Sequence, residues 1–191
     1  MPETFKKQII SDALFDRIRG LSYADGCDIP LSRLSYLTFP YVTFDGPTAR
    51  GELICNVAIA DDLLEIFSEL YSIRYPLAKV RLIDDFGADD NRSMAANNTS
   101  SFNYRKIVGS DRLSLHARGL AVDINPLFNP YVKGDVVLPP EGARYADRSR
   151  LLPGMITEDD PCCRAFVNRG FEWGGAWSTR KDYQHFEKEL P

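Results

Sequence analysis

The sequence predicts an α+β fold in a single domain. The fold class follows from two observations: a few segments have helical apolar spacing, and short alternating segments typical of strands lie between them. A third is that no linker, internal repeat or low-complexity tract divides the 191 residues, which are enough for one sizeable core and few for two. We expect residues 1–55 to form an N-terminal extension packed on a core of residues 56–191.

Composition argues against several classes of function. Hydrophobic residues make up 44% of the chain and charged residues 26%, which is ordinary for a globular protein. The net charge of −4 argues against a dedicated nucleic-acid or anionic-membrane binder. No apolar run is long enough for a transmembrane segment. Residues 1–7 lack the features of a signal peptide, so the protein is either cytoplasmic or had its signal removed.

The N-terminal part predicts a short helix and then a hairpin. Ser11 can cap a helix over residues 11–20, and Gly20 suits the position just past its end. Residues 34–44 are rich in β-branched and aromatic side chains, with Pro40 expected to break the run. Residues 45–46 are an Asp-Gly turn, and residues 51–55 can return as the partner strand.

The middle of the chain contains the strongest helical pattern. We expect Asn56 to cap this helix, whose apolar face comprises Ile59, Leu63, Ile66, Phe67 and Leu70. A strand is expected over residues 79–84, a polar loop over 86–101 and a second strand over 101–107. A polar loop of that length is more often functional than idle.

Asp123 is the first physical indication of a functional site. Residues 120–124 alternate as a strand, with Leu120, Val122 and Ile124 on one face and Asp123 on the other. A carboxylate in an apolar strand is costly unless it is paired or bound to a metal. We expect a loop from about residue 125 to 155, a helix over 157–168, an aromatic turn over 172–177 and a final strand over 183–187.

The two histidines of the chain, His116 and His185, complete a possible metal site with Asp123. Two imidazoles and one carboxylate are a typical ligand set for a catalytic zinc ion, which keeps one position open for water. Gly119 would let the chain bend between the first two ligands. The four cysteines show no CxxC pair, so a cysteine zinc site is not expected.

Hydrolysis at such a site also needs a general base and a group that holds the substrate. Asp182 and Glu187 flank His185 and are both candidates for the base. Glu187 would share a face of a regular strand with His185, whereas Asp182 reaches the site only from a turn that opens the strand, so spacing leaves both open. Arg105 is the best cation for a substrate carboxylate or carbonyl, with Arg118 as competitor.

These residues resemble a known family. Ser114-x-His116-x-x-Gly119-x-Ala121-x-Asp123, followed downstream by Asp182-x-x-His185, is similar to the zinc D-Ala-D-Ala carboxypeptidases and dipeptidases of the peptidase M15 family. That family also includes L-Ala-D-Glu endopeptidases. The flanking segments, residues 102–105, 123–126 and 173–177, look like the carboxypeptidase branch. The resemblance covers roughly residues 79–187.

The resemblance implies both a fold and a division of roles. It implies a small antiparallel sheet carrying the metal site with flanking helices, as in the hedgehog and D-Ala-D-Ala peptidase folds. It implies that His116, Asp123 and His185 bind Zn²⁺, that Asp182 is the catalytic base, that Arg105 polarises the substrate carbonyl or holds its carboxylate, and that Ser114 lines the substrate pocket. The implied substrate is a peptidoglycan stem peptide, and the implied location is therefore extracytoplasmic.

Other functions stay open at this stage. The chain can be an L-Ala-D-Glu-type endopeptidase rather than a carboxypeptidase. It can also be a non-catalytic zinc domain of the same fold, or a binding module whose histidines hold no metal.

Overall fold

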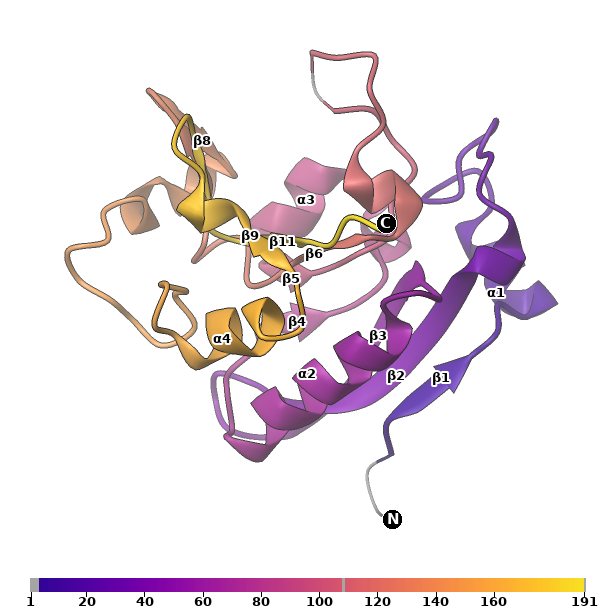
Figure 1. Ribbon diagram of the computed structural model, residues 1–191, viewed down its shortest axis with the longest axis horizontal. Coiled ribbons are helices and arrows are strands. Elements are labelled where there is room, and N and C mark those ends of the chain that lie inside the picture. Colours follow the sequence, from indigo (N-terminus) through magenta and orange to yellow (C-terminus); the bar gives the residue numbers. More distant parts are fainter. Residues whose placement is uncertain (1–3, 108, 191) are drawn as a thin grey trace.

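The computed structural model describes residues 4–107 and 109–190, and it shows a mixed α/β fold with small antiparallel sheets (Figure 1). Within the described residues there are three three-stranded sheets, in the orders β1-β2-β3, β10-β7-β8 and β6-β11-β9, and one two-stranded pair, β4-β5. The α+β class and the antiparallel sheets are therefore as predicted. None of the described helices combines the length and apolarity needed to cross a membrane.

The largest sheet comprises β1 (Lys6–Gln8), β2 (Leu34–Val42) and β3 (Thr48–Asn56). β2 and β3 form the predicted antiparallel hairpin around the Asp-Gly turn, and the 3-10 helix η1 (Leu31–Arg33) precedes it. The expectation that Pro40 breaks the strand is wrong. β1 pairs only with residues 36–38 of β2. Among the described residues, Pro40 therefore has no neighbouring strand on the β1 side, and a sheet tolerates a proline where no partner strand needs its missing N–H.

Helix α1 (Asp12–Ile18) begins as predicted, because the Ser11 hydroxyl accepts a hydrogen bond from the Leu14 amide at 3.3 Å. The chain leaves the helix through Gly20 in the left-handed region, at φ +75°. Its apolar side chains belong to a small core formed by Leu14, Ile18, Leu34, Ile54, Leu82 and Phe102.

Helix α2 (Ala60–Ser72) lies across the β1-β2-β3 sheet (Figure 1). Its predicted apolar face is buried, and the Phe67 ring stacks on Phe39 at 4.2 Å between centroids. The prediction that Asn56 caps this helix is wrong, because the helix begins at Ala60 with Ile59 at the cap position. Asn56 ends β3 instead, and its side-chain NH₂ donates to the Arg118 carbonyl at 3.1 Å.

Residues 83–107 differ most from the expectation. The 3-10 helix η2 (Ile83–Phe86) and helix α3 (Asp90–Ala95) form where a strand end and a polar loop were expected, and Asp89 caps α3. β4 (Lys79–Val80) pairs with β5 (Asn98–Thr99) in parallel. The strand predicted over residues 101–107 is wrong. Its backbone instead bonds to separate elements, as when the Phe102 amide donates to the Ile54 carbonyl.

The segment expected to be a loop after Asp123 also carries structure. β7 (Tyr131–Lys133) and β8 (Val136–Leu138) form a hairpin, and the 3-10 helix η4 (Pro140–Tyr145) follows. The next helix, α4 (Pro161–Val167), starts later than predicted. Asp160, not Thr157, caps it by accepting from the Cys162 amide, with Pro161 in the first turn.

The C-terminal sheet is built from β6 (Ala121–Asp123), β11 (His185–Glu187) and β9 (Glu172–Trp173), all antiparallel. Along the chain, the 3-10 helix η5 (Gly174–Ala176) and β10 (Lys181–Asp182) follow β9 and precede β11. Phe186 of β11 stacks on Phe166 of α4 at 4.2 Å. One main core, including Leu37, Phe67, Val122, Phe166 and Phe186, thus joins the N-terminal sheet, α2, α4 and the C-terminal sheet.

Candidate metal centre

Three elements bring the predicted ligands together. His116 lies in the 3-10 helix η3 (Leu115–Arg118), Asp123 ends β6, and His185 begins β11. Antiparallel pairing places His185 directly opposite Asp123. Gly119 ends η3 at φ +67°, a left-handed conformation that returns the chain into β6.

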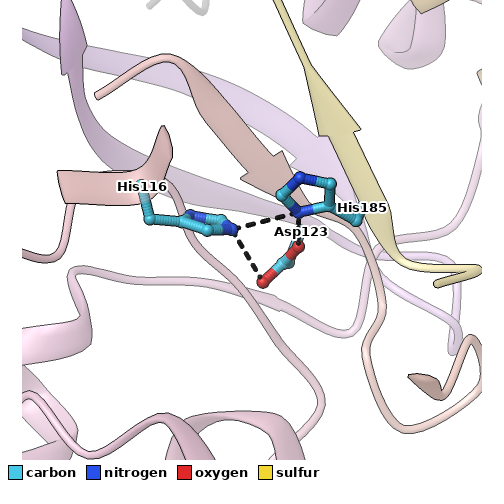
Figure 2. Close-up of side chains that lie close together, drawn as sticks. All are labelled: His116, Asp123 and His185. Atoms are coloured by element: carbon cyan, nitrogen blue, oxygen red, sulfur yellow. Dashed lines mark hydrogen bonds and ion pairs between the residues drawn. The ribbon is translucent and has the colours of Figure 1, made fainter. Parts of the chain in front are cut away.

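The side chains of these residues converge (Figure 2). His116 Nε2 lies 3.2 Å from His185 Nδ1 and 3.3 Å from Asp123 Oδ2. His185 Nδ1 lies 3.0 Å from Asp123 Oδ1. Both imidazoles are buried, and the Asp123 side chain is only 15% exposed. The three donors thus form one compact cluster.

The other nitrogen of each imidazole has a partner of its own. His116 Nδ1 lies 2.7 Å from the Ser101 carbonyl oxygen, and His185 Nε2 lies 2.8 Å from a Glu187 carboxylate oxygen. A carbonyl only accepts, so the Nδ1–H of His116 donates to it, and this leaves Nε2 as the acceptor atom that faces the cluster. Carbonyls and carboxylates behind the outer nitrogen are the usual support for metal-binding histidines.

The electrostatics of the cluster favour a bound cation. Burial opposes ionisation of Asp123, but the neighbouring His116 and His185 hold the pKa of its carboxyl well below the usual range. Burial of the His185 ring lowers its basicity, yet the bonds with Asp123 and Glu187 raise its pKa to about 10. Three carboxylates, those of Asp123, Glu187 and Asp182, thus act on the His185 imidazole, and they stabilise positive charge at this ring.

The donor set fits a small divalent metal ion. Ligand atoms about 2.1 Å from a tetrahedral zinc ion lie roughly 3.4 Å from one another. The two imidazole nitrogens lie 3.2 Å apart, close to that value, and each lies 3.0–3.3 Å from a different oxygen of Asp123. Of the described residues, His116, Asp123 and His185 form the one group of three or more such side chains whose ligand atoms gather within 4.8 Å.

Asp182 lies next to the cluster and is partly exposed, with its Oδ1 atom buried. Asp182 ends β10, and a two-residue turn leads from it to His185 at the start of β11. Asp182 thus precedes the strand of His185 through a turn, as its predicted role as base requires. Its Oδ1 atom has no hydrogen-bond partner among the described residues. Burial raises the pKa of Asp182 to about 6, against the opposing effect of His185. Glu187, by contrast, is already bonded to His185.

The remaining predicted site residues lie in different surroundings. The Ser114 hydroxyl caps η3 by accepting from the His116 amide at 3.2 Å, so it helps to fix that ligand. Arg105 forms an ion pair with Asp90 of α3, and the Arg105 carbonyl accepts from the Ser114 amide. Arg118, its competitor, is exposed at the surface.

One part of the site was not predicted from the sequence. A groove of about 440 Å³ borders Glu187 and is lined by Glu172, Trp177, Ser178, Thr179, Arg180 and Glu187. The Trp177 ring lies 5.5 Å from the His185 ring. Trp177 lies in the predicted aromatic turn, and no motif in the sequence indicates Arg180. The one available indication in the sequence was that Trp177 and Arg180 lie three residues apart, shortly before the last predicted ligand, His185.

The C-terminal part of the chain, residues 108–188, matches a family model described as D-alanyl-D-alanine carboxypeptidase, an M15 peptidase. This segment is therefore similar to the M15 peptidase family, over 81 of the 191 residues. The match contains all three clustered donors and Asp182, whereas Arg105 lies before its first residue. No curated protein and no solved structure matches the chain.

Proposed function

We propose that this chain is a zinc-dependent peptidase that hydrolyses D-amino-acid-containing stem peptides of peptidoglycan, as a D-Ala-D-Ala carboxypeptidase does. The observation that carries the proposal is the His116–Asp123–His185 cluster inside a segment that is similar to the M15 family. The shared core supports one domain, in which residues 1–55 pack on the peptidase region.

His116 Nε2, His185 Nδ1 and an Asp123 oxygen would hold the zinc ion. When bound there, a zinc ion would supply Lewis-acid chemistry for activating water and polarising a peptide carbonyl. The chain prepares its own donors for this role. Ser101 and Glu187 fix the outer nitrogens of the two imidazoles, and the Ser114 cap fixes the turn that carries His116.

Asp182 is the proposed general base. Its carboxylate must take a proton from the attacking water, which requires an oxygen that is not already bonded and a pKa near the working pH. Its Oδ1 atom meets the first condition, and a pKa raised to about 6 by burial meets the second. Glu187 meets neither, because it bonds His185 and this bond lowers its pKa despite its burial.

Arg105 is the proposed cation for a substrate carbonyl or carboxylate. Its ion pair with Asp90 fixes the guanidinium, and Asn103 holds Asp90 in place with a bond of 3.0 Å. A guanidinium fixed on one side keeps other N–H groups for a substrate. Ser114 is proposed to border the same pocket, since its amide bonds the Arg105 carbonyl.

The direct test is to strip the protein of metal, add zinc back, and follow release of D-Ala from a stem pentapeptide. We expect release only with zinc, and none from His116→Ala under the same conditions. Mass analysis of a peptidoglycan digest identifies the bond and separates a carboxypeptidase from an L-Ala-D-Glu endopeptidase. If the zinc-loaded protein cleaves no muropeptide, the proposal fails.

The second candidate is a non-catalytic zinc domain of the same fold. The unbonded Asp182 oxygen argues against it, since a purely structural site has no use for a buried carboxylate oxygen without a partner. An Asp182→Ala protein that retains its full biological effect would favour it. Since the proposed substrate is part of the cell wall, we further propose an extracytoplasmic location.

A further inference from the structure

The groove beside the metal cluster is lined mainly by polar side chains. Glu187 forms part of its wall and also contacts His185, so the groove and the cluster share a residue. Trp177 lines the groove and its ring lies 5.5 Å from the His185 ring. The groove therefore adjoins the cluster at the His185 ring.

Arg180 is the one cation that lines this groove. Its guanidinium carbon lies 4.1 Å from the centroid of the Trp177 ring, which is a close cation–π contact. In the part of the chain that the structure describes, no carboxylate lies within ion-pair distance of Arg180. Stacking orients the guanidinium plane and leaves its N–H edge available.

The two acidic residues of the groove have other partners. Glu172 accepts a hydrogen bond from Trp177 Nε1, and Glu187 is bonded to His185 Nε2. Glu187 therefore supports His185, and Glu172 fixes the Trp177 indole on which the Arg180 guanidinium packs. The groove thus contains a cation that is held against Trp177 and, among the described residues, forms no close ion pair, although its charge also acts on Asp182 and Glu187.

Building on the proposed function, we propose that Arg180 binds a substrate carboxylate that is not part of the cleaved bond, and so determines specificity for peptides with that carboxylate free. A guanidinium edge matches a carboxylate in a two-point contact that a carboxamide cannot reproduce. Two sources in a stem peptide fit this chemistry, the C-terminal carboxylate and the α-carboxylate of an isoglutamyl residue.

The test compares stem peptides that differ only in one group, carboxylate or carboxamide, at each of these two positions. We expect wild type to prefer the free acid at one position by about 10- to 100-fold in kcat/KM, as one charged contact provides. The position that shows the preference identifies the source. Arg180→Gln should abolish the preference, and Arg180→Lys should restore part of it, because lysine keeps the charge but not the fork.

Arg33→Gln is the matched control, since Arg33 is an exposed arginine of the N-terminal part and lies outside the groove. It should keep the wild-type preference. If Arg180→Gln discriminates between acid and amide as strongly as wild type does, the assignment of Arg180 is wrong. If wild type discriminates at neither position, it is wrong as well.

A binding measurement separates this inference from the proposed function. Trp177 is one of only two tryptophans, and the other, Trp173, is buried, so a ligand at Arg180 should change Trp177 fluorescence. Metal-free protein is titrated with the acid and amide peptides, and Trp177→Phe identifies the signal. Affinity for the acid that drops at least 10-fold in Arg180→Gln supports the inference even if no peptide is cleaved. Equal affinities of the two proteins overturn it even if cleavage is observed.

Discussion

The N-terminal sheet and the C-terminal sheet are stabilised in different ways. β2 and β3 are nine residues long and pair along their whole length, and α2 packs its apolar face on them. β6 and β11 have three residues each and β9 has two. Strands so short cannot form a stable sheet by themselves. The long sheet is self-supporting, whereas the short one depends on its surroundings.

The difference explains where the chemistry lies. Asp123 on the edge strand β6, His185 on the central strand β11 and His116 in the adjacent 3-10 helix η3 bring a carboxylate and two imidazoles together, which costs folding energy unless those groups are satisfied. The cost is offset by Phe186, which stacks on α4, and by contacts to the N-terminal sheet. Asn56 of β3 donates from its amide to the Gly119 carbonyl and from its side chain to Arg118. The stable region thus holds the reactive one in place.

The largest effect should come from the two carboxylates beside His185, which have different proposed roles. Asp182→Asn removes the base, and kcat should fall by about 10²- to 10⁴-fold with zinc still bound. Glu187→Gln weakens the support of His185, and zinc affinity should fall about 10- to 100-fold. Activity assays at saturating zinc, with metal content measured in parallel, separate the two. Loss of zinc from Asp182→Asn would contradict its role as base.

Metal binding should distinguish the two sheets in hydrogen exchange. Zinc at 100 times its dissociation constant stabilises the native state by about 2.7 kcal/mol. We expect this increase in protection mainly at amides of β6, β11 and η3, with little change in β2 and β3. Equal protection across both sheets would mean that they unfold as one unit. His116→Ala is the control, because it should show no zinc effect in either region.

The contrast between the long N-terminal sheet and the short C-terminal sheet also explains which features could be predicted from the sequence. The β2–β3 hairpin and the α2 face follow from local patterns, since each buries many apolar residues at a regular spacing. The ligands were predicted because Asp123 breaks such a pattern and because the motif resembles a family. Helix α3 was missed because its segment is polar, although Asp89 is an ordinary capping residue. The ion pair of Arg105 with Asp90 and the stack of Arg180 on Trp177 depend on how side chains meet in space, which spacing does not encode.

The contact between the two regions can be broken at Gly119. An added Cβ would lie 2.6 Å from the Asn56 backbone nitrogen, in a residue at φ +67°. Gly119→Ala should destabilise the protein by about 1–3 kcal/mol from backbone strain alone, and by more because of the clash. The matched control is Gly134→Ala, at φ +56° with open space around the added carbon. Urea unfolding of both variants isolates the clash, and equal losses of stability would show that the Asn56 contact is unimportant.

The smallest effect concerns an ion-pair cluster in the N-terminal region. Arg17 bonds both oxygens of Glu52, at 2.9 and 2.7 Å, and also contacts Asp85 at 2.7 Å. Burial raises the pKa of Glu52, but the bonds from Arg17 and Tyr36 lower it overall, below its ordinary 4.5. Asp85 is likewise held below its ordinary pKa of 3.8, because Arg17 and Arg81 outweigh its burial.

A carboxyl whose pKa is lower in the folded state stabilises that state above its unfolded pKa, and the contribution is lost as pH falls through the folded pKa. Wild type should therefore lose stability below about pH 4.5, beginning where unfolded Glu52 takes up its proton. Glu52→Gln should cost about 1 kcal/mol at pH 7, as a partly exposed pair contributes, and the cost should shrink as pH falls through the folded pKa of Glu52. Glu141→Gln, at an exposed position in η4, is the control and should track wild type at every pH. A Glu52→Gln deficit that stays constant from pH 7 to pH 3 would show that the loss comes from packing rather than charge.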